Sequence, residues 1–182
     1  LGCAPLPWAI PHPMAMVTNK KTNLFHSNVS HYELMRDLNR QWRQWTIDEP
    51  AVFITFNGMA YDEELVRRQF YWNLFESYLT NTNGNGRLDI LLMMNNVAAF
   101  SPDVLNIPLF NGGPGVSLKQ ADIAEANGIE IGDAHDAIAD CKLMISLLEK
   151  INAKKPELID FFLSISTKPG VQAAVQQPGF LG

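Results

Sequence analysis

A short apolar run followed at once by a turn and a helix start limits the possible fold more than any other part of this chain. Residues 51–56 (Ala-Val-Phe-Ile-Thr-Phe) are mostly β-branched or aromatic, with turn residues on both sides. Such a run is typical of a buried strand in a parallel sheet. Asn57-Gly58 then lets the backbone turn sharply, and a helix is predicted from Asp62. The chain is therefore predicted to be α/β, with Asp62 beyond the carboxyl end of a strand, where open α/β sheets bind ligands.

Helical patterns occupy much of the remaining chain. The helix predicted over residues 31–45 begins with a capping-box pattern, Ser30 followed by Glu33. The helix that starts at Asp62 has apolar residues at helical spacing on one face. These residues are Val66, Phe70, Leu74 and Tyr78.

Two more helices are predicted in the second half of the chain. Ser117 and Gln120 form another capping-box pattern before a helix that ends at Gly128. The helix that follows has a periodic apolar face and is predicted to bury it. That face consists of Ala137, Cys141, Ile145, Leu148 and Ile151.

The connector between these two helices carries a histidine. His135 and Asp140 are five residues apart. On one regular helix, residues five apart point about 140° away from each other. The two side chains therefore converge only if His135 lies in the turn before the helix, which Gly132 and Asp133 permit.

Asp62, His135 and Asp140 are the candidate catalytic residues. Carboxylate oxygens bind hard divalent cations such as Mg²⁺, and a neutral histidine can accept a proton from an attacking water. Together these groups suit hydrolysis of a phosphodiester with two metal ions. The same residues also have plain structural interpretations, because an Asp at a helix start is commonly a cap and a loop histidine is commonly unremarkable. Their spacing alone leaves both interpretations open.

The overall composition excludes several classes of protein. A net charge of −5 argues against binding nucleic acid through bulk positive charge, but is compatible with an enzyme that meets phosphates through metal ions. Cys3 and Cys141 form neither a disulfide framework nor a cysteine-rich zinc site, which favours the reducing cytoplasm. No apolar run reaches about 18 residues, so no membrane span or membrane partner is expected.

Two long segments resemble motifs of the bacterial exonuclease I family, which is part of the DEDD superfamily of 3′→5′ exonucleases, histidine subtype. Residues 56–71 resemble the family's second motif: an Asn, a short spacer, an aromatic residue and an Asp, followed by acidic residues at the start of a helix. Residues 126–129 and 134–140 resemble its third motif, His-x4-Asp. Three further segments resemble parts of the family and occur in the same order along the chain: Arg87-x-Asp89, Ser117-Leu118 and residues 156–162. The resemblance runs from about Pro11 to Ser166.

This resemblance implies a ribonuclease H-like α/β exonuclease fold and assigns roles to single residues. Asp62 and Asp140 would be metal-site carboxylates and His135 the general base, with two Mg²⁺ or Mn²⁺ ions in the complete enzyme. Asn57 and Tyr61 would shape the site around Asp62 and contact the substrate. The implied partners are single-stranded DNA, shortened from its 3′ end to mononucleotides, and single-strand-binding protein.

The chain departs from the family at its first motif. That motif is Asp-x-Glu on the first strand, and no such motif precedes Pro11. The Asp-x-Glu in this chain is Asp62-Glu-Glu64, whose Asp already belongs to the second motif. We therefore expect residues 1–166 to be a partial exonuclease domain that lacks the first strands and is inactive by itself. Residues 167–182 are expected to be a linker or the start of a further domain.

Two other functions stay open at this level. The first is a related exonuclease on the same scaffold that acts on RNA, or in proofreading or repair. The second is a non-catalytic remnant that holds nucleic acid or a protein. The acidic balance counts against strong metal-free binding, because such affinity comes mainly from neutralising phosphates.

Overall fold

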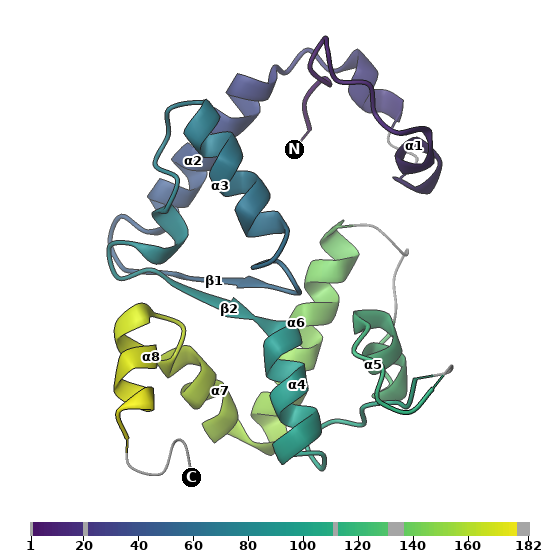
Figure 1. Ribbon diagram of the computed structural model, residues 1–182, viewed down its shortest axis with the longest axis vertical. Helices are drawn as coiled ribbons and strands as arrows, with labels where there is room; N and C mark the ends of the chain where they lie inside the picture. Colours follow the sequence, from purple (N-terminus) through teal and green to yellow (C-terminus); the bar gives the residue numbers. More distant parts are fainter. Residues whose placement is uncertain (1, 20–21, 111–112, 131–136, 178–182) are drawn as a thin grey trace. The chain divides into compact units, whose positions relative to one another are not determined.

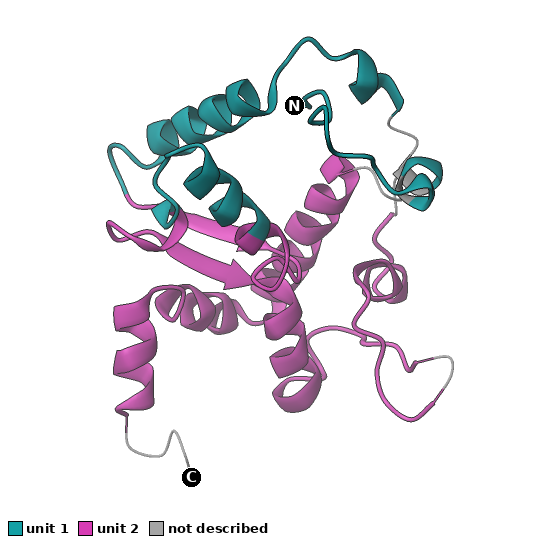
Figure 2. Cartoon of the chain, turned by 45° about the horizontal axis from the view of Figure 1, so that its top comes forward, with its two compact units in different colours: residues 1–49, 65–79 teal, residues 50–64, 80–182 magenta. Residues whose placement is uncertain are grey.

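The computed structural model describes residues 2–19, 22–110, 113–130 and 137–177, and is shown in Figure 1. These residues form two compact units, coloured separately in Figure 2. Unit 1 is Leu1–Glu49 with Leu65–Leu79, and unit 2 is Pro50–Glu64 with Thr80–Gly182. None of the described helices is long and apolar enough to cross a membrane.

Unit 1 is helical. Its elements are α1 (Pro13–Asn19), the 3₁₀ helix η1 (Thr22–His26), α2 (His31–Trp45), the larger part of α3 (Asp62–Trp72) and the start of η2 (Leu79–Asn81). The capping box predicted for α2 is confirmed. The Glu33 backbone N–H donates to Ser30 Oγ at 3.2 Å, and the Ser30 backbone N–H donates to Glu33 Oε2 at 2.8 Å.

Aromatic contacts hold α2 against the end of α3. Phe70 is 1% exposed and lies between the edges of Trp42 and Phe75, with ring centroids 5.5 and 6.2 Å away. The predicted apolar face of α3 is therefore correct at Phe70. It is wrong at Leu74, which is 93% exposed because the helix ends at Trp72 and Leu74 turns the chain with a positive φ of 59°.

Unit 2 contains a two-stranded parallel sheet among its described residues. Strand β1 (Val52–Thr55) pairs with β2 (Gly86–Asp89), Val52 lying opposite Gly86 and Thr55 opposite Asp89. The parallel strand predicted within residues 51–56, and the α/β class, are confirmed. Strand β2 was not predicted, because it has only four residues and runs directly into the next helix.

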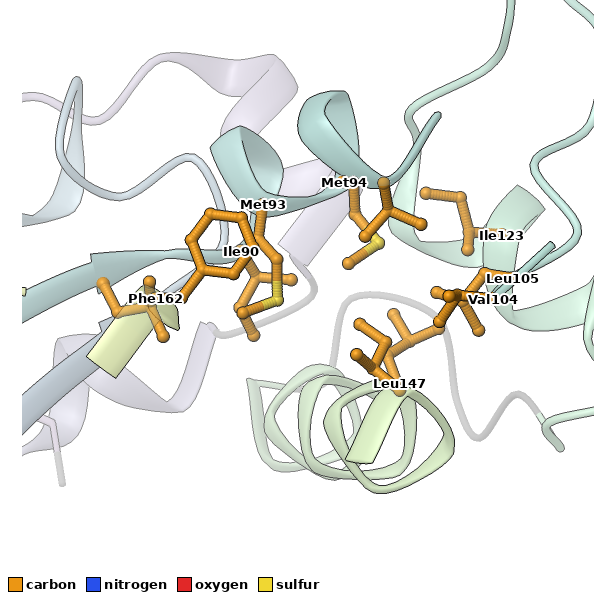
Figure 3. Packing of buried hydrophobic residues seen from close by; sticks show 11 residues of the cluster. Ile90, Met93, Met94, Val104, Leu105, Ile123, Leu147 and Phe162 are labelled. Atoms are coloured by element: carbon orange, nitrogen blue, oxygen red, sulfur yellow. The ribbon is translucent and has the colours of Figure 1, made fainter. Parts of the chain in front are cut away.

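Five α-helices lie wholly within the described part of unit 2, and all but α8 contribute side chains to one core. They are α4 (Ile90–Phe100), α5 (Gln120–Ala126), α6 (Ala137–Lys154), α7 (Pro156–Ser164) and α8 (Lys168–Val175). Figure 3 shows Met93 and Met94 of α4, Leu147 of α6 and Phe162 of α7 in this core, all 5% exposed or less. Helix α8 lies in the predicted linker region; its Thr167 Oγ1 accepts from the Gly170 backbone N–H at 3.2 Å.

Two helix predictions in unit 2 need correction. Helix α6 buries Leu143, Leu147 and Ile151, whereas Cys141 and Ile145 on the predicted face are exposed. Both faces have apolar residues, and the tertiary contacts of Leu147 decide which one is inside. At α5 the capping residue is Lys119, which makes no side-chain cap. Instead of capping the helix, the Ser117 hydroxyl donates to the Asp122 carboxylate.

Candidate functional site

A tight turn after β1 places Asp62 at the start of α3. Asn57 adopts a positive φ of 58°, and the Gly58 carbonyl accepts from the backbone N–H groups of Tyr61 at 3.1 Å and Glu63 at 2.9 Å. A Cβ at Gly58 would collide with the Thr55 side chain, so the turn needs glycine there. The prediction that Asp62 follows the carboxyl end of a parallel strand is confirmed.

The carboxylate of Asp89 fixes this turn from the neighbouring strand. Asp89 is 4% exposed and ends β2. Its Oδ1 accepts from the Asn57 backbone N–H at 2.7 Å, and its Oδ2 accepts from the Met59 N–H at 3.2 Å. Oδ1 also accepts from the Leu91 N–H at 3.0 Å, which caps α4. Asp89 therefore determines the path of the chain that leads to Asp62.

Sequence reasoning gave Asp89 a place in the family's order but no structural role. Its position directly before an apolar helix is a detectable N-cap signal. Its bonds to Asn57 and Met59 have no such signal, because those residues lie 32 and 30 positions away.

Beside the turn, Glu63 rather than Asp62 points into the protein. The Glu63 side chain is 8% exposed, and its Oε2 accepts from Arg87 Nη1 at 2.8 Å. Burial raises the pKa of Glu63, and the hydrogen bond and charge of Arg87 oppose that rise. Its Oε1 is buried without a hydrogen-bond partner in the described structure. Asp62 itself is exposed, so its carboxylate is accessible to a ligand.

The second predicted carboxylate lies at the start of α6. Asp140 is exposed in the first turn of this helix. Its backbone oxygen accepts from Gln120 Nε2 at 2.6 Å, which ties α6 to α5. His135, the predicted general base, lies outside the described residues, and so does Asp133.

Asp62 and Asp140 are the candidate metal ligands that the structure describes. Asp62 and Asp140 are accessible oxygen donors, the ligand type that Mg²⁺ and Mn²⁺ prefer. Within the described ranges, however, no group of three or more His, Cys, Asp or Glu is arranged to hold a metal ion. The predicted substrate contacts Asn57 and Tyr61 are both exposed, Tyr61 by 69%.

Comparison with known sequences places these residues in context. No protein-family profile matches the chain. Exodeoxyribonuclease I of Buchnera aphidicola subsp. Baizongia pistaciae is 29% identical over 174 residues, covering 93% of this chain and 35% of that protein. Exodeoxyribonuclease I of Escherichia coli K12 is 30% identical over 125 residues, covering 68% of this chain and 26% of that protein. The chain thus spans about a third or less of the length of these curated relatives.

Comparison with solved structures identifies the fold. E. coli exonuclease I in complex with a dT13 oligonucleotide matches with a TM-score of 0.82 at 23% identity, covering 94% of this chain and 36% of that one. E. coli ExoI has also been solved in a zinc-bound form with single-stranded DNA, and an ExoI/SSB-Ct complex matches this chain with the same TM-score of 0.82.

The fold similarity and the named relatives agree with the motifs at residues 56–71 and 134–140. The relatives are exodeoxyribonucleases, the class of enzyme that those motifs predict. The predicted exonuclease fold is confirmed over most of the chain. This chain is therefore a relative of the bacterial exodeoxyribonuclease I family.

Proposed function

We propose that this chain is part of a 3′→5′ exodeoxyribonuclease, which hydrolyses single-stranded DNA to mononucleotides. The observation that carries the proposal is the turn after β1, which Asp89 fixes and which leaves the Asp62 carboxylate exposed at the carboxyl end of a parallel strand. Ligands of open α/β sheets bind at this position. The exodeoxyribonuclease I relatives supply the substrate class.

Each candidate residue has a separate role in this proposal. In the complete enzyme, Asp62 and Asp140 would hold two Mg²⁺ or Mn²⁺ ions together with the carboxylates of the family's first motif, and these ions would neutralise charge at the phosphate. His135 accepts a proton from the water that attacks the terminal phosphodiester. Asn57 and Tyr61, both accessible beside Asp62, orient the last nucleotide.

The partners and the cellular location of the enzyme are part of the same proposal. Its partners are single-stranded DNA and single-strand-binding protein, by analogy with the E. coli complexes. Cys3 and Cys141 are free thiols, which suits the reducing cytoplasm. Residues 1–166 form the exonuclease part of this chain.

The 182-residue chain is expected to have little or no nuclease activity by itself, because it lacks the family's first motif, the Asp-x-Glu expected before Pro11. The measurement is release of labelled mononucleotides from 3′-labelled single-stranded DNA with Mg²⁺. E. coli exonuclease I serves as the positive control. Robust degradation that His135→Ala abolishes would overturn this expectation.

Protein expressed from the full reading frame tests the proposed function directly. It is expected to degrade DNA in preference to RNA, and to require a divalent metal. His135→Ala is expected to lower kcat by about 10² to 10⁴, the usual contribution of a general base. Preference for RNA would point to the related ribonuclease instead, and strand binding without cleavage would point to a binding module.

A further inference from the structure

The face of the sheet that meets the start of α3 is polar. Leu88 belongs to the apolar core of unit 2, and Val52 packs against that core. Successive side chains of a strand point to opposite faces, so Arg87 and Asp89, on either side of Leu88, point to the other face. On that face Arg87 contacts Glu63 of α3, and Asp89 accepts hydrogen bonds from the turn before the helix. The first turn of α3 is therefore attached to the sheet through charged side chains.

The contact between Glu63 and Arg87 is a largely buried ion pair. Glu63 Oε2 accepts from Arg87 Nη1 at 2.8 Å, and the two side chains are 8% and 33% exposed, respectively. The second carboxylate oxygen of Glu63, Oε1, is buried and accepts no hydrogen bond from the described residues. The cost of removing two charges from water largely offsets their attraction, and an unpaired oxygen adds to that cost. A gain in stability is therefore a poor explanation for a glutamate at this position.

The position of Glu63 in the helix gives the ion pair a different consequence. Glu63 directly follows Asp62, and consecutive helix residues point about 100° apart. The Glu63 backbone N–H donates to the Gly58 carbonyl at 2.9 Å, which ties the start of α3 to the turn. The ion pair is a second attachment of the same residue, made through its side chain to strand β2. Together the two attachments fix the rotation of this first turn about the helix axis, with Asp62 on the exposed side.

We propose that Glu63 and Arg87 are positioning residues for Asp62, because their ion pair sets the direction in which the Asp62 carboxylate points. The role of Asp62 as a metal ligand rests on the proposed function. In this arrangement Asp89 holds the backbone of the turn, and the ion pair holds the helix that follows. Glu63 and Arg87 contact neither the metal ions nor the DNA, and they act only through Asp62.

The test uses protein expressed from the full reading frame, in which Glu63→Met and Arg87→Met are combined. Two methionines fill similar space without charge, so the Tm is expected to be unchanged or higher. The Kd for Mn²⁺ alone, followed by electron paramagnetic resonance, is expected to rise about tenfold, as is usual when a residue that orients a metal ligand is lost. With Mn²⁺ present, kcat is expected to fall about tenfold while the KM for DNA stays the same.

Glu157→Met is the matched control for these measurements. Glu157 is also the second residue of a helix in unit 2, but it is exposed. This variant should leave the Kd for Mn²⁺ and kcat unchanged. Unchanged values of both in the double methionine variant, with a Tm that shows an intact fold, would overturn the proposal.

Glu63→Gln separates the direction of the side chain from its charge. The amide carbonyl still accepts a hydrogen bond from Arg87, so the Kd for Mn²⁺ is expected to stay the same as in the unsubstituted protein. A Kd raised as much as in the double methionine variant would mean that the charge of Glu63 acts on the metal ion directly. That outcome would also overturn a positioning role.

Hydrogen exchange of backbone amides in EDTA gives a readout that needs neither metal nor DNA. The N–H groups of residues 61 and 63, which donate to the Gly58 carbonyl, are expected to exchange faster in the double methionine variant. Unchanged exchange at both residues would contradict the proposed attachment. If the unsubstituted protein neither cleaves DNA nor binds Mn²⁺, the proposed function fails, but the exchange rates still test whether the ion pair holds the turn. The two failures are therefore distinguishable.

Discussion

Unit 1 and unit 2 bury their side chains in different ways. Of the sixteen buried hydrophobic residues among those described, thirteen lie in unit 2, and only Met35, Phe70 and Leu79 lie in unit 1. In unit 2, side chains of α4, α6 and α7 pack into one continuous core (Figure 3). Unit 1 is held by local devices instead: a capping box, a cluster of aromatic rings and the Arg43–Glu76 ion pair at 3.0 Å.

This difference in packing decides which side chains are held in place and which stay exposed. A packed core gives rigid positions to Asp62 and Asp140, as the proposed metal site would need. A thin core leaves aromatic side chains such as Tyr71 and Trp72 exposed to solvent.

The largest effects are expected when one central side chain is removed from the core of each unit, which tests the difference in packing between them. Leu147→Ala is expected to cost about 2–5 kcal/mol of unfolding free energy, and Phe70→Ala about 3–5 kcal/mol, because both side chains are almost fully buried. Amide hydrogen exchange should show lost protection in α4 and α6 for Leu147→Ala, and in α2 and α3 for Phe70→Ala. Ile145→Ala on α6, where the side chain is 56% exposed, is the control with little expected effect. Equal loss of protection throughout the chain for both variants would show that the two units unfold as one.

Smaller losses of stability are expected from substitution of two carboxylates, the structural Asp89 and the proposed metal ligand Asp140. Asp89→Asn removes the charge that accepts three backbone hydrogen bonds and should cost about 1–3 kcal/mol. Asp140→Asn should change stability by less than about 0.5 kcal/mol, because its side chain is exposed. Chemical denaturation measures both. An Asp140 variant as destabilised as the Asp89 variant would mean that Asp140 has a structural role and is not reserved for a metal ion.

The smallest effect is expected at the capping box of α2. Ser30→Ala should cost about 1 kcal/mol, since the Ser30 side chain satisfies a free N–H at the helix start. Hydrogen bonds from Ser30 lower the pKa of Glu33 below its usual value. The stability that Glu33 adds to the folded chain is therefore present above the unfolded-state pKa of its carboxyl, and it is lost as the pH falls through the lowered folded-state pKa. The Tm of Glu33→Ala should accordingly lie below the Tm of the unsubstituted chain at pH 7, and this difference should shrink at low pH. A difference in Tm that does not depend on pH would contradict this account.

Features set by neighbouring residues were predictable. The strand at 51–56, the cap at Ser30 and the stop at Gly128 all depend on a few adjacent residues, and all are present. The motif at residues 56–71 likewise identified the enzyme family, because its residue types and spacing are specific enough to be recognised without a structure.

Features set by distant partners were not predictable. Strand β2 has little signal of its own and exists because β1 pairs with it. Both faces of α6 have apolar residues, so burial of Leu147 rather than Ile145 follows from where α4 and α7 lie.

The amino-acid sequence by itself determined the local elements, the family and the identity of the candidate residues Asp62, His135 and Asp140. Tertiary structure alone decided that Asp89 holds the turn before Asp62 and that Glu63 turns inward to Arg87. The physical reason is that caps and turns form between neighbours in the chain. Burial and long-range hydrogen bonds depend instead on which distant segments the folded chain brings together.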